Sequence, residues 1–278
     1  MAKSTSPKKQ QAPTRNFLPY LALTGVVVAA AVAFVLNIPE PPLDWQNFVL
    51  PMVNRYVGMP TSSPDQMSTK PLAGFNVVIS GATSGIGKGT VKGMIKLGAN
   101  VIAIGRNATK LEMLQDEMRS NTLTTVMADY NDLDTVARVA DEITQKVDHI
   151  DILLNNAGIH EGAMLLSNPV SKQGYDRIFS VNYLAHVLLT EKLAPALNKS
   201  PQKAPIIAQM SSSFHWVGDW SDLIPTANGN PPPASQPGGT GGVFRTQRGY
   251  GNSKLAMIFH ARALKRRNPE LQRARIVR

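Results

Sequence analysis

Short apolar runs alternate with stretches of helical periodicity from residue 71 to the end of the chain. Runs such as NVIAIG at 100–105 are typical of buried strands, whereas LDTVARVADEITQKV at 133–147 repeats apolar residues at helical spacing. The predicted strands cover 75–80, 100–105, 123–128, 150–155, 205–211 and 274–277, and the predicted helices cover 86–98, 108–120, 133–147, 171–198 with a bend near Pro195, and a last helix from Gly251. This alternation predicts right-handed βαβ units and a doubly wound parallel sheet of the α/β class.

Residues 17–36 carry a different hydrophobic pattern, the continuous run FLPYLALTGVVVAAAVAFVL, with no charge between Arg15 and Glu40. A helix of about 20 apolar residues spans the hydrocarbon core of a bilayer. We therefore predict an uncleaved membrane anchor. The alternative is a cleaved signal peptide or a plastid-type presequence, although the apolar core of a signal peptide is usually about 7–15 residues.

The chain thus divides into four parts with different compositions. A basic segment at 1–16 precedes the predicted transmembrane helix at 17–36, and a Pro-rich linker at 37–70 leads to the α/β domain at 71–278. The four basic residues in the first segment predict a cytosolic N-terminus and a lumenal α/β domain. The predicted location is the endoplasmic reticulum or another endomembrane, with plastid targeting as the alternative.

Charge and cysteine content narrow the function classes. The net charge of +10 is concentrated at the two ends, because residues 245–278 carry ten Lys or Arg against Glu270. Two basic ends on a mildly acidic body argue against a nucleic-acid-binding domain, whose basic residues form one coherent surface. The absence of cysteine excludes disulfides, thiolate metal sites and cysteine nucleophiles. The histidines show no metal-like spacing, so we predict no metal site.

A glycine-rich turn, SGATSGIG at 80–87, joins the first predicted strand to the first predicted helix. Glycines at 81, 85 and 87 allow a tight turn and a close approach of the backbone to a pyrophosphate, while the helix N-terminus supplies free N–H groups. The alternative interpretation is a tight turn with no role in ligand binding. The second strand ends in Gly105-Arg106, where an arginine suits a 2′-phosphate and an acidic residue would suit a ribose hydroxyl. Arg106 therefore favours NADP(H) over NAD(H), unless it is only a solvated loop residue.

Five motifs in order resemble those of the classical short-chain dehydrogenases/reductases. They are SGATSGIG at 80–87, NNAG at 155–158, Asn182, SSSFH at 211–215 and YGNSK at 250–254. GIGK, SSxxH and YGNSKLA are most similar to the retinol-dehydrogenase-like, often membrane-anchored, branch. The resemblance covers about 71–278 and implies a Rossmann-like fold.

The resemblance also implies roles for single residues. Tyr250 would be the general acid/base, Lys254 would hold the nicotinamide ribose and lower the pKa of the tyrosine, Ser212 would hydrogen-bond the substrate oxygen, and Asn182 would support a proton-relay water beside Lys254. Asp129 would bind adenine, although Tyr130 replaces the usual following leucine. The implied cofactor contacts are Gly81, Ser84, Gly85, Ile86, Gly87, Arg106, Asp129, Asn155, Ala157, Gly158, Tyr250 and Lys254.

Elementary chemistry supports the catalytic roles independently. A free tyrosine has a pKa of about 10, which suits proton transfer near neutrality poorly. An ammonium group one helical turn away favours the phenolate and lowers that pKa, and a serine hydroxyl can stabilise a developing oxyanion. Without the other motifs, a Tyr/Lys pair four residues apart would be an ordinary helix surface. The choice among Ser211, Ser212 and Ser213 follows the SSxxH alignment, and His160, His186 and His215 are interpreted as structural or as lining the cleft.

Two departures from the family pattern affect the expected function. Between Ser212 and Tyr250 lie 37 residues, and 225–242 has the composition of a flexible insertion. The chain also stops at Arg278, just after the last predicted strand, so the domain is expected to be C-terminally incomplete.

The predicted function is an NADP(H)-dependent oxidoreductase that interconverts an alcohol and its carbonyl on an apolar retinoid, steroid or lipid-like substrate. The expected partners are this small molecule, the membrane and a second copy of the chain in a dimer or tetramer. The alternative is a nucleotide-binding regulatory or scaffold protein without turnover. A plastid-envelope or import-associated member of the family is a third hypothesis.

Overall fold

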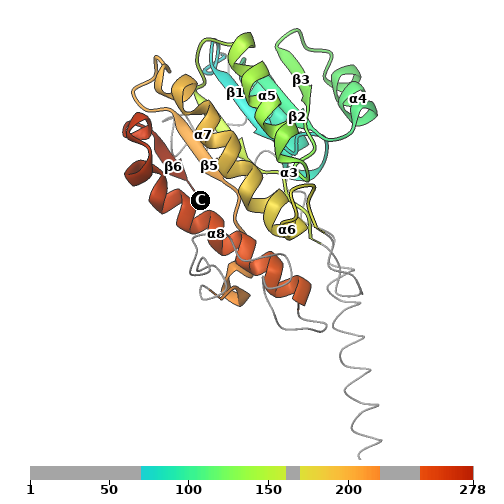
Figure 1. Ribbon diagram of the computed structural model, residues 1–278. Helices are drawn as coiled ribbons and strands as arrows, with labels where there is room; N and C mark the ends of the chain where they lie inside the picture. Colours follow the sequence, from blue (N-terminus) through green and yellow to red (C-terminus); the bar gives the residue numbers. More distant parts are fainter. Residues whose placement is uncertain (1–69, 161–169, 220–244, 278) are drawn as a thin grey trace, which may run out of the picture. The chain divides into compact units, whose positions relative to one another are not determined.

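The computed structural model describes residues 70–160, 170–219 and 245–277. Within them, six parallel strands form one sheet in the order β3-β2-β1-β4-β5-β6 (Figure 1). The strands are β1 (Asn76–Ser80), β2 (Asn100–Gly105), β3 (Leu123–Met127), β4 (Ile152–Asn155), β5 (Ile206–Gln209) and β6 (Arg275–Val277). Because the order reverses between β1 and β4, the carboxyl ends of these two strands flank the crevice where doubly wound sheets bind ligands.

Helices cover both faces of this sheet, which gives the Rossmann-like arrangement that the alternating pattern predicts. The helices are α3 (Gly85–Lys96), α4 (Ala108–Met118), α5 (Leu133–Lys146), α6 (Arg177–Phe179), α7 (Ala185–Asn198) and α8 (Arg245–Arg267). Apolar residues of α5, α7 and α8 form one core cluster with residues of the sheet, and those of α3 and α4 join a second cluster. Figure 1 shows α5, α7 and α8 following one another across the face of the sheet that carries the first of these clusters.

Full burial on both faces explains why the central strands β1, β4 and β5 are mostly apolar. Every residue of β1 is buried, and all five pair in register with residues of β2, from Asn76 opposite Asn100 to Ser80 opposite Ile104. The predicted last strand is present as well, because Ile276 of β6 pairs with Ile207 of β5. The sequence-based strand boundaries therefore lie within two residues of those observed.

Two predicted helices begin elsewhere. The helix predicted over 171–198 begins only at Arg177, because the preceding segment folds back in a turn: the amide of Ser171 donates to the carbonyl of Tyr175 at 2.7 Å, and Gly174 has a φ of +82°. Asp176 then caps α6 through its side chain. The irregular part of this helix is the π-helix Ser180–Leu184 rather than Pro195, through which α7 continues.

The last helix, α8, begins at Arg245, six residues before the predicted start at Gly251. Tyr250 and Lys254 therefore both lie inside a helix. Among the described residues, no helix is long and apolar enough to cross a membrane. The predicted anchor at 17–36, nearly all of the linker at 37–70 and the insertion at 225–242 lie outside the described residues.

Candidate active site

The glycine-rich turn after β1 is packed so closely that a side chain is excluded at Gly81 and at Gly87. A Cβ atom added to Gly87 would overlap the carbonyl oxygen of Gly81, and one added to Gly81 would lie 2.7 Å from the Cα atom of Ala157. Gly81 and Gly85 also adopt positive φ angles of +65° and +52°, which favour glycine. Gly81 and Gly87 thus allow the close packing of the turn, and Gly85, where a Cβ atom would meet nothing within 4 Å, is favoured by its positive φ angle.

Helix α3 begins directly behind this turn with its first N–H groups uncapped by side chains. Ser84 occupies the N-cap position but makes no side-chain capping bond, and the first turn contains no acidic residue. Ser84 and Gly85 are exposed, and Ile86 is half-buried. A helix N-terminus in this state attracts an anion through its dipole and its free N–H groups.

Arg106 lies one position beyond the carboxyl end of β2 and is exposed. The preceding Gly105 leaves room for Thr83 of the glycine-rich turn, since a Cβ atom at Gly105 would lie 2.8 Å from the Thr83 Cγ2 atom. Arg106 thus directly follows a residue that packs against the turn. Asn107 follows and caps α4 by accepting from the Lys110 amide at 2.9 Å.

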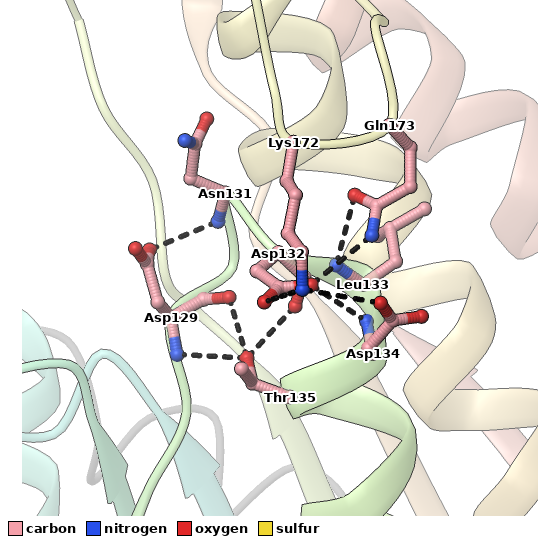
Figure 2. A network of polar contacts seen from close by, with 8 residues as sticks. All are labelled: Asp129, Asn131, Asp132, Leu133, Asp134, Thr135, Lys172 and Gln173. Carbon is pink, nitrogen blue, oxygen red and sulfur yellow. Dashed lines mark hydrogen bonds and ion pairs between the residues drawn. The ribbon is translucent and has the colours of Figure 1, made fainter.

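Asp129 lies beyond β3, at the next strand end along the sheet, and is exposed. Its Oδ1 atom accepts from the Asn131 amide at 3.0 Å, and its own amide donates to the Thr135 hydroxyl at 3.0 Å. These bonds hold the loop between β3 and α5 in a defined conformation (Figure 2).

Figure 2 also shows how a distant segment braces this loop. The Lys172 ammonium contacts the carboxylates of Asp132 at 2.8 Å and Asp134 at 3.3 Å. Gln173 accepts from the Leu133 amide at 3.2 Å and donates to Asp132 at 3.0 Å. The hydrogen bonds from Lys172 and Gln173 lower the pKa of Asp132 below its usual value.

The NNAG turn after β4 is tied to the end of β1. The amides of Asn156 and Ala157 both donate to the Ser80 hydroxyl, at 2.8 and 2.9 Å. Gly158 is exposed beside them. Asn155 is fully buried, and its side-chain amide donates to Thr190 and Gln209 at 2.8 and 3.1 Å, so this side chain lies in the interior.

Asn182, in the π-helix, joins this turn to α8. Its Oδ1 atom accepts from the Ile159 amide at 2.8 Å, and its Nδ2 group donates to the Ile159 carbonyl at 3.0 Å and to the Ser253 hydroxyl at 3.1 Å. Asn182 is fully buried. One side chain therefore fixes the distance between the segment after NNAG and the residue preceding Lys254.

Lys254 is buried at the centre of these elements. Its ammonium donates to the carbonyl of Met210, just beyond β5, at 2.9 Å, and lies 5.5 Å from the centre of the Tyr250 ring. A Cβ atom at Gly158 would lie 3.5 Å from this ammonium and 3.4 Å from the Asn182 Oδ1 atom. Burial lowers the pKa of Lys254 to about 8.

The serine run differs from one hydroxyl to the next. The Ser211 hydroxyl donates to the Lys254 carbonyl at 2.9 Å and so supports α8. The Ser212 hydroxyl accepts from the Phe214 amide at 3.3 Å and caps the short 3₁₀ helix Ser213–Val217. His215 bonds through Nδ1 to the Ser212 carbonyl at 2.6 Å. Ser212 and Tyr250 are both half-buried.

Two aromatic contacts beside Tyr250 were not predicted from the sequence. The ring of His160 lies edge-on to the Tyr250 ring at a centroid distance of 4.7 Å, and the Phe214 ring does so at 5.8 Å. Phe214 and His160 also contact each other at 5.9 Å. The sequence offers one signal for each residue: His160 lies two residues after NNAG, and Phe214 lies two residues after Ser212.

The arrangement fits a nicotinamide dinucleotide cofactor. The glycine-rich turn and the uncapped α3 suit a pyrophosphate, and the buried Lys254 suits a ribose next to Tyr250. Within 70–160, 170–219 and 245–277, no cluster of three His, Asp or Glu residues could hold a metal ion.

Comparisons with known proteins agree with this geometry. The family model described as short chain dehydrogenase matches residues 76–216. Human retinol dehydrogenase 13 is 30% identical over 203 residues, covering 70% of this chain and 55% of its own length. Human polyprenol dehydrogenase is 27% identical over 197 residues, covering 68% of this chain and 54% of its own length. The chain therefore spans about half the length of these curated relatives.

Solved structures share the fold. The Pseudomonas aeruginosa RhlG/NADP active-site complex aligns with a TM-score of 0.54 and 24% identity, covering 72% of this chain and 70% of that one. The identity is too low for this match to show more than the fold. The match of the family model to half of the chain shows that the chain belongs to the short-chain dehydrogenase family.

Proposed function

We propose that this chain is part of an NADP(H)-dependent oxidoreductase that interconverts an alcohol and its carbonyl on an apolar substrate. The observation that carries the proposal is the position of Lys254. A buried ammonium, bonded to the carbonyl of Met210 and 5.5 Å from the Tyr250 ring, lies at the carboxyl end of a parallel sheet. The glycine-rich turn opens at the same edge.

Each residue then has a defined part in the reduction. The Tyr250 hydroxyl gives its proton to the substrate oxygen, and the Ser212 hydroxyl donates a hydrogen bond to that oxygen as negative charge develops. Lys254 holds the ribose and stabilises the phenolate that remains on Tyr250. When bound, the nicotinamide supplies the hydride that the carbonyl carbon accepts. The carbonyl gains one hydride and one proton and becomes the alcohol, and oxidation runs these transfers in reverse.

NADP(H) is the preferred cofactor because Arg106 stands where an acidic residue would select a ribose hydroxyl. Arg106 is exposed and directly follows a residue that packs against the glycine-rich turn. Its guanidinium can bind a phosphate with two parallel hydrogen bonds.

An apolar substrate is supported by three independent observations. Two relatives are named retinol dehydrogenase 13 and polyprenol dehydrogenase, after apolar alcohols. Phe214, which contacts the Tyr250 ring, is 40% exposed and offers an apolar surface next to the reacting group. The apolar run at 17–36 would anchor the enzyme in the membrane where such substrates dissolve. The proposal also includes the domain boundaries given in the sequence analysis and the assembly of the chain into a dimer or tetramer.

The test is reduction of all-trans-retinal by the full chain in lipid nanodiscs, followed as loss of NADPH absorbance. Turnover is expected in the wild type and its loss in Tyr250→Phe, which keeps the ring contacts and removes the hydroxyl. The matched control is Tyr175→Phe, a half-buried tyrosine outside the site. Full turnover in Tyr250→Phe would overturn the mechanism. NADPH binding without turnover of any retinoid, steroid or polyprenyl carbonyl would support the scaffold alternative instead.

Anchoring is tested separately by membrane fractionation of cells that express the chain. The wild type is expected to stay with the membranes after alkaline carbonate extraction, and a variant that lacks 17–36 is expected to become soluble. A variant with 225–242 deleted is the matched control and should remain with the membranes. Release of the wild type by carbonate would contradict the anchor.

A further inference from the structure

His186, which lies inside the core on α7, is used by none of the steps above. Its side chain is fully buried, and the Tyr130 ring packs edge-on against it at a centroid distance of 5.1 Å. A fully buried imidazole must satisfy its two nitrogens with partners from the protein. The partners of this one connect two parts of the candidate active site.

The Nδ1 atom of His186 lies 3.0 Å from the carbonyl oxygen of Asn182. A carbonyl oxygen only accepts, so Nδ1 must carry the proton. Burial lowers the pKa of His186 to about 3, which leaves the ring neutral near pH 7. In a neutral imidazole with a protonated Nδ1, the Nε2 atom is an acceptor.

The Nε2 atom lies 3.1 Å from the Ser80 hydroxyl, which therefore donates to it. The Ser80 oxygen accepts hydrogen bonds from the amides of Asn156 and Ala157 at 2.8 and 2.9 Å. Both of its lone pairs are then used, and its own proton remains available for donation. Its single proton can then go to the Nε2 atom of His186, to the Leu154 carbonyl, which is more distant at 3.4 Å, or to the Tyr130 hydroxyl oxygen, and only the first satisfies the buried Nε2 acceptor. The donor and acceptor inventory thus gives one direction for the whole chain of bonds.

We propose that His186, as the neutral Nδ1–H tautomer, is a positioning residue that couples the cofactor-binding turns to Asn182 and Lys254. On one side it fixes Ser80, which precedes Gly81 and holds the NNAG turn. On the other side it fixes the backbone of Asn182, whose amide group bonds Ser253 at 3.1 Å, next to Lys254. This inference rests on the proposed function for its catalytic arm, whereas its structural and binding arms do not require turnover.

The two bonds can be separated by substitution because amide side chains mimic one ring nitrogen each. Gln at 186 places an oxygen near the Nε2 position and can accept from Ser80. Asn at 186 places an NH₂ group near the Nδ1 position and can donate to the Asn182 carbonyl. His186→Leu removes both bonds and leaves buried polar groups unpaired.

Binding and turnover of the full chain in nanodiscs are then measured, with NADPH fluorescence for the Kd and retinal reduction for kcat and KM. His186→Leu is expected to raise the NADPH Kd about tenfold and to lower kcat about tenfold, with the retinal KM unchanged. His186→Gln should recover the Kd but not kcat, and His186→Asn should recover kcat but not the Kd. Leu189→Ala, a buried change on the same helix, should lower the Tm and leave both constants of the folded protein unchanged.

A purely structural role for His186 predicts instead that all three variants lose activity only in proportion to their folded fraction, which would overturn the proposal. A second readout is the ¹⁵N NMR spectrum of the histidine rings, which needs neither cofactor nor turnover. We expect a neutral Nδ1–H tautomer for His186 from pH 5 to 8, assigned by its loss in His186→Gln. An Nε2–H tautomer or titration in this range would contradict the proposal, whereas the expected spectrum and Kd pattern without turnover would leave it standing and refute only the proposed reaction.

Discussion

The ammonium group of Lys254 lies 5.5 Å from the centre of the Tyr250 ring, one turn away on the same helix. The same group donates to the carbonyl of Met210, which belongs to a different element. Lys254 is thereby held inside the protein, 3% exposed, instead of extending into solvent as a helix-surface lysine would. Burial has a measurable cost for its charge.

Replacement of this lysine should change how stability depends on pH. Burial lowers the pKa of Lys254 from 10.5 to about 8, so the native state carries fewer protons than the unfolded state between these values. The free-energy cost of burying this charge is at its maximum below about pH 8 and disappears as the pH rises toward 10.5. Relative to Lys254→Met, the wild type should therefore gain stability with rising pH, by at most about 3 kcal/mol.

Urea unfolding of both proteins at pH 7.5 and 9.5 measures this difference, because the titration of other groups cancels in the comparison. Lys92→Met, a change on the exposed surface of α3, is the matched control and should show no such pH dependence. A difference between wild type and Lys254→Met that stays constant over this range would show that Lys254 is not buried as a cation. Lys254→Met should also abolish retinal reduction.

The serine run offers a second prediction, because adjacent hydroxyls have different partners. Ser212→Ala is expected to lower kcat about a hundredfold by removing one donor to the substrate oxygen. Ser211→Ala removes a hydrogen bond to the Lys254 carbonyl and should cost about 1 kcal/mol of stability with a smaller effect on kcat. Steady-state kinetics and urea unfolding of the two variants distinguish them, and a larger loss of kcat in Ser211→Ala would reassign the oxygen contact.

Arg106 should decide between the two nicotinamide cofactors. Arg106→Asp removes the partner of a 2′-phosphate and introduces an acceptor for a ribose hydroxyl. The ratio of kcat/KM for NADPH to that for NADH is expected to fall at least tenfold, with the loss on NADPH caused by a higher KM. Lys92→Asp makes the same charge change elsewhere and should leave the ratio unaltered. An unchanged ratio in Arg106→Asp would mean that other residues select the phosphate.

Gly87 tests the backbone cradle. In Gly87→Ala the new methyl group would overlap the carbonyl oxygen of Gly81, so the turn must move. We expect the NADPH Kd to rise at least tenfold, measured by fluorescence titration. Gly249→Ala, where a Cβ atom meets nothing within 4 Å, is the matched control, and it should bind NADPH as the wild type does. Unchanged binding by Gly87→Ala would place the pyrophosphate elsewhere.

Burial of His260 is expected to lower the free energy of unfolding at acidic pH. Burial lowers the pKa of His260 to about 4, so its contribution is fully present above pH 6.5 and is lost as the pH falls toward 4. His260→Asn places its amide oxygen near the Nδ1 position, which lies 3.3 Å from the Gln209 side chain, so it can still bond Gln209 but cannot be protonated. The variant should therefore lose less stability than the wild type between pH 7 and 5, by about 2 kcal/mol. Equal losses in urea unfolding would contradict burial of this ring.

The fold could be predicted because its signals are local. Apolar runs such as 100–105 mark strands buried on both faces, and Gly98 and Asn107 mark the helix ends between them. The helix predicted from residue 171 was wrong at its start, because the turn at Gly174 and the contacts of Lys172 with the α5 loop outweigh the helical periodicity there. The Tyr250–Lys254 spacing could likewise be read from one helical turn.

The remaining features of the site depend on elements that are distant in the sequence. Ser80 is an unremarkable last residue of a strand until β4 and α7 bring Asn156 and His186 to its hydroxyl. The Met210 carbonyl that holds Lys254 is a backbone atom and leaves no residue signature. His160 and Phe214 become neighbours of Tyr250 only when the loop after β4, the 3₁₀ helix after β5 and α8 come together.

Asn182 has a consequence for the order in which the protein folds. Its bonds join Ile159 to Ser253, which is 71 positions away from Asn182, so they close a long loop of chain. Contacts of such sequence separation form after local ones, since the loop entropy has to be overcome before they contribute. A nascent chain whose β1 to β5 segments have emerged from the ribosome can therefore assemble most of the sheet. Its candidate active site is still incomplete at that stage, because α8 has not yet packed against it. We expect competence for chemistry to appear in one step, when α8 docks.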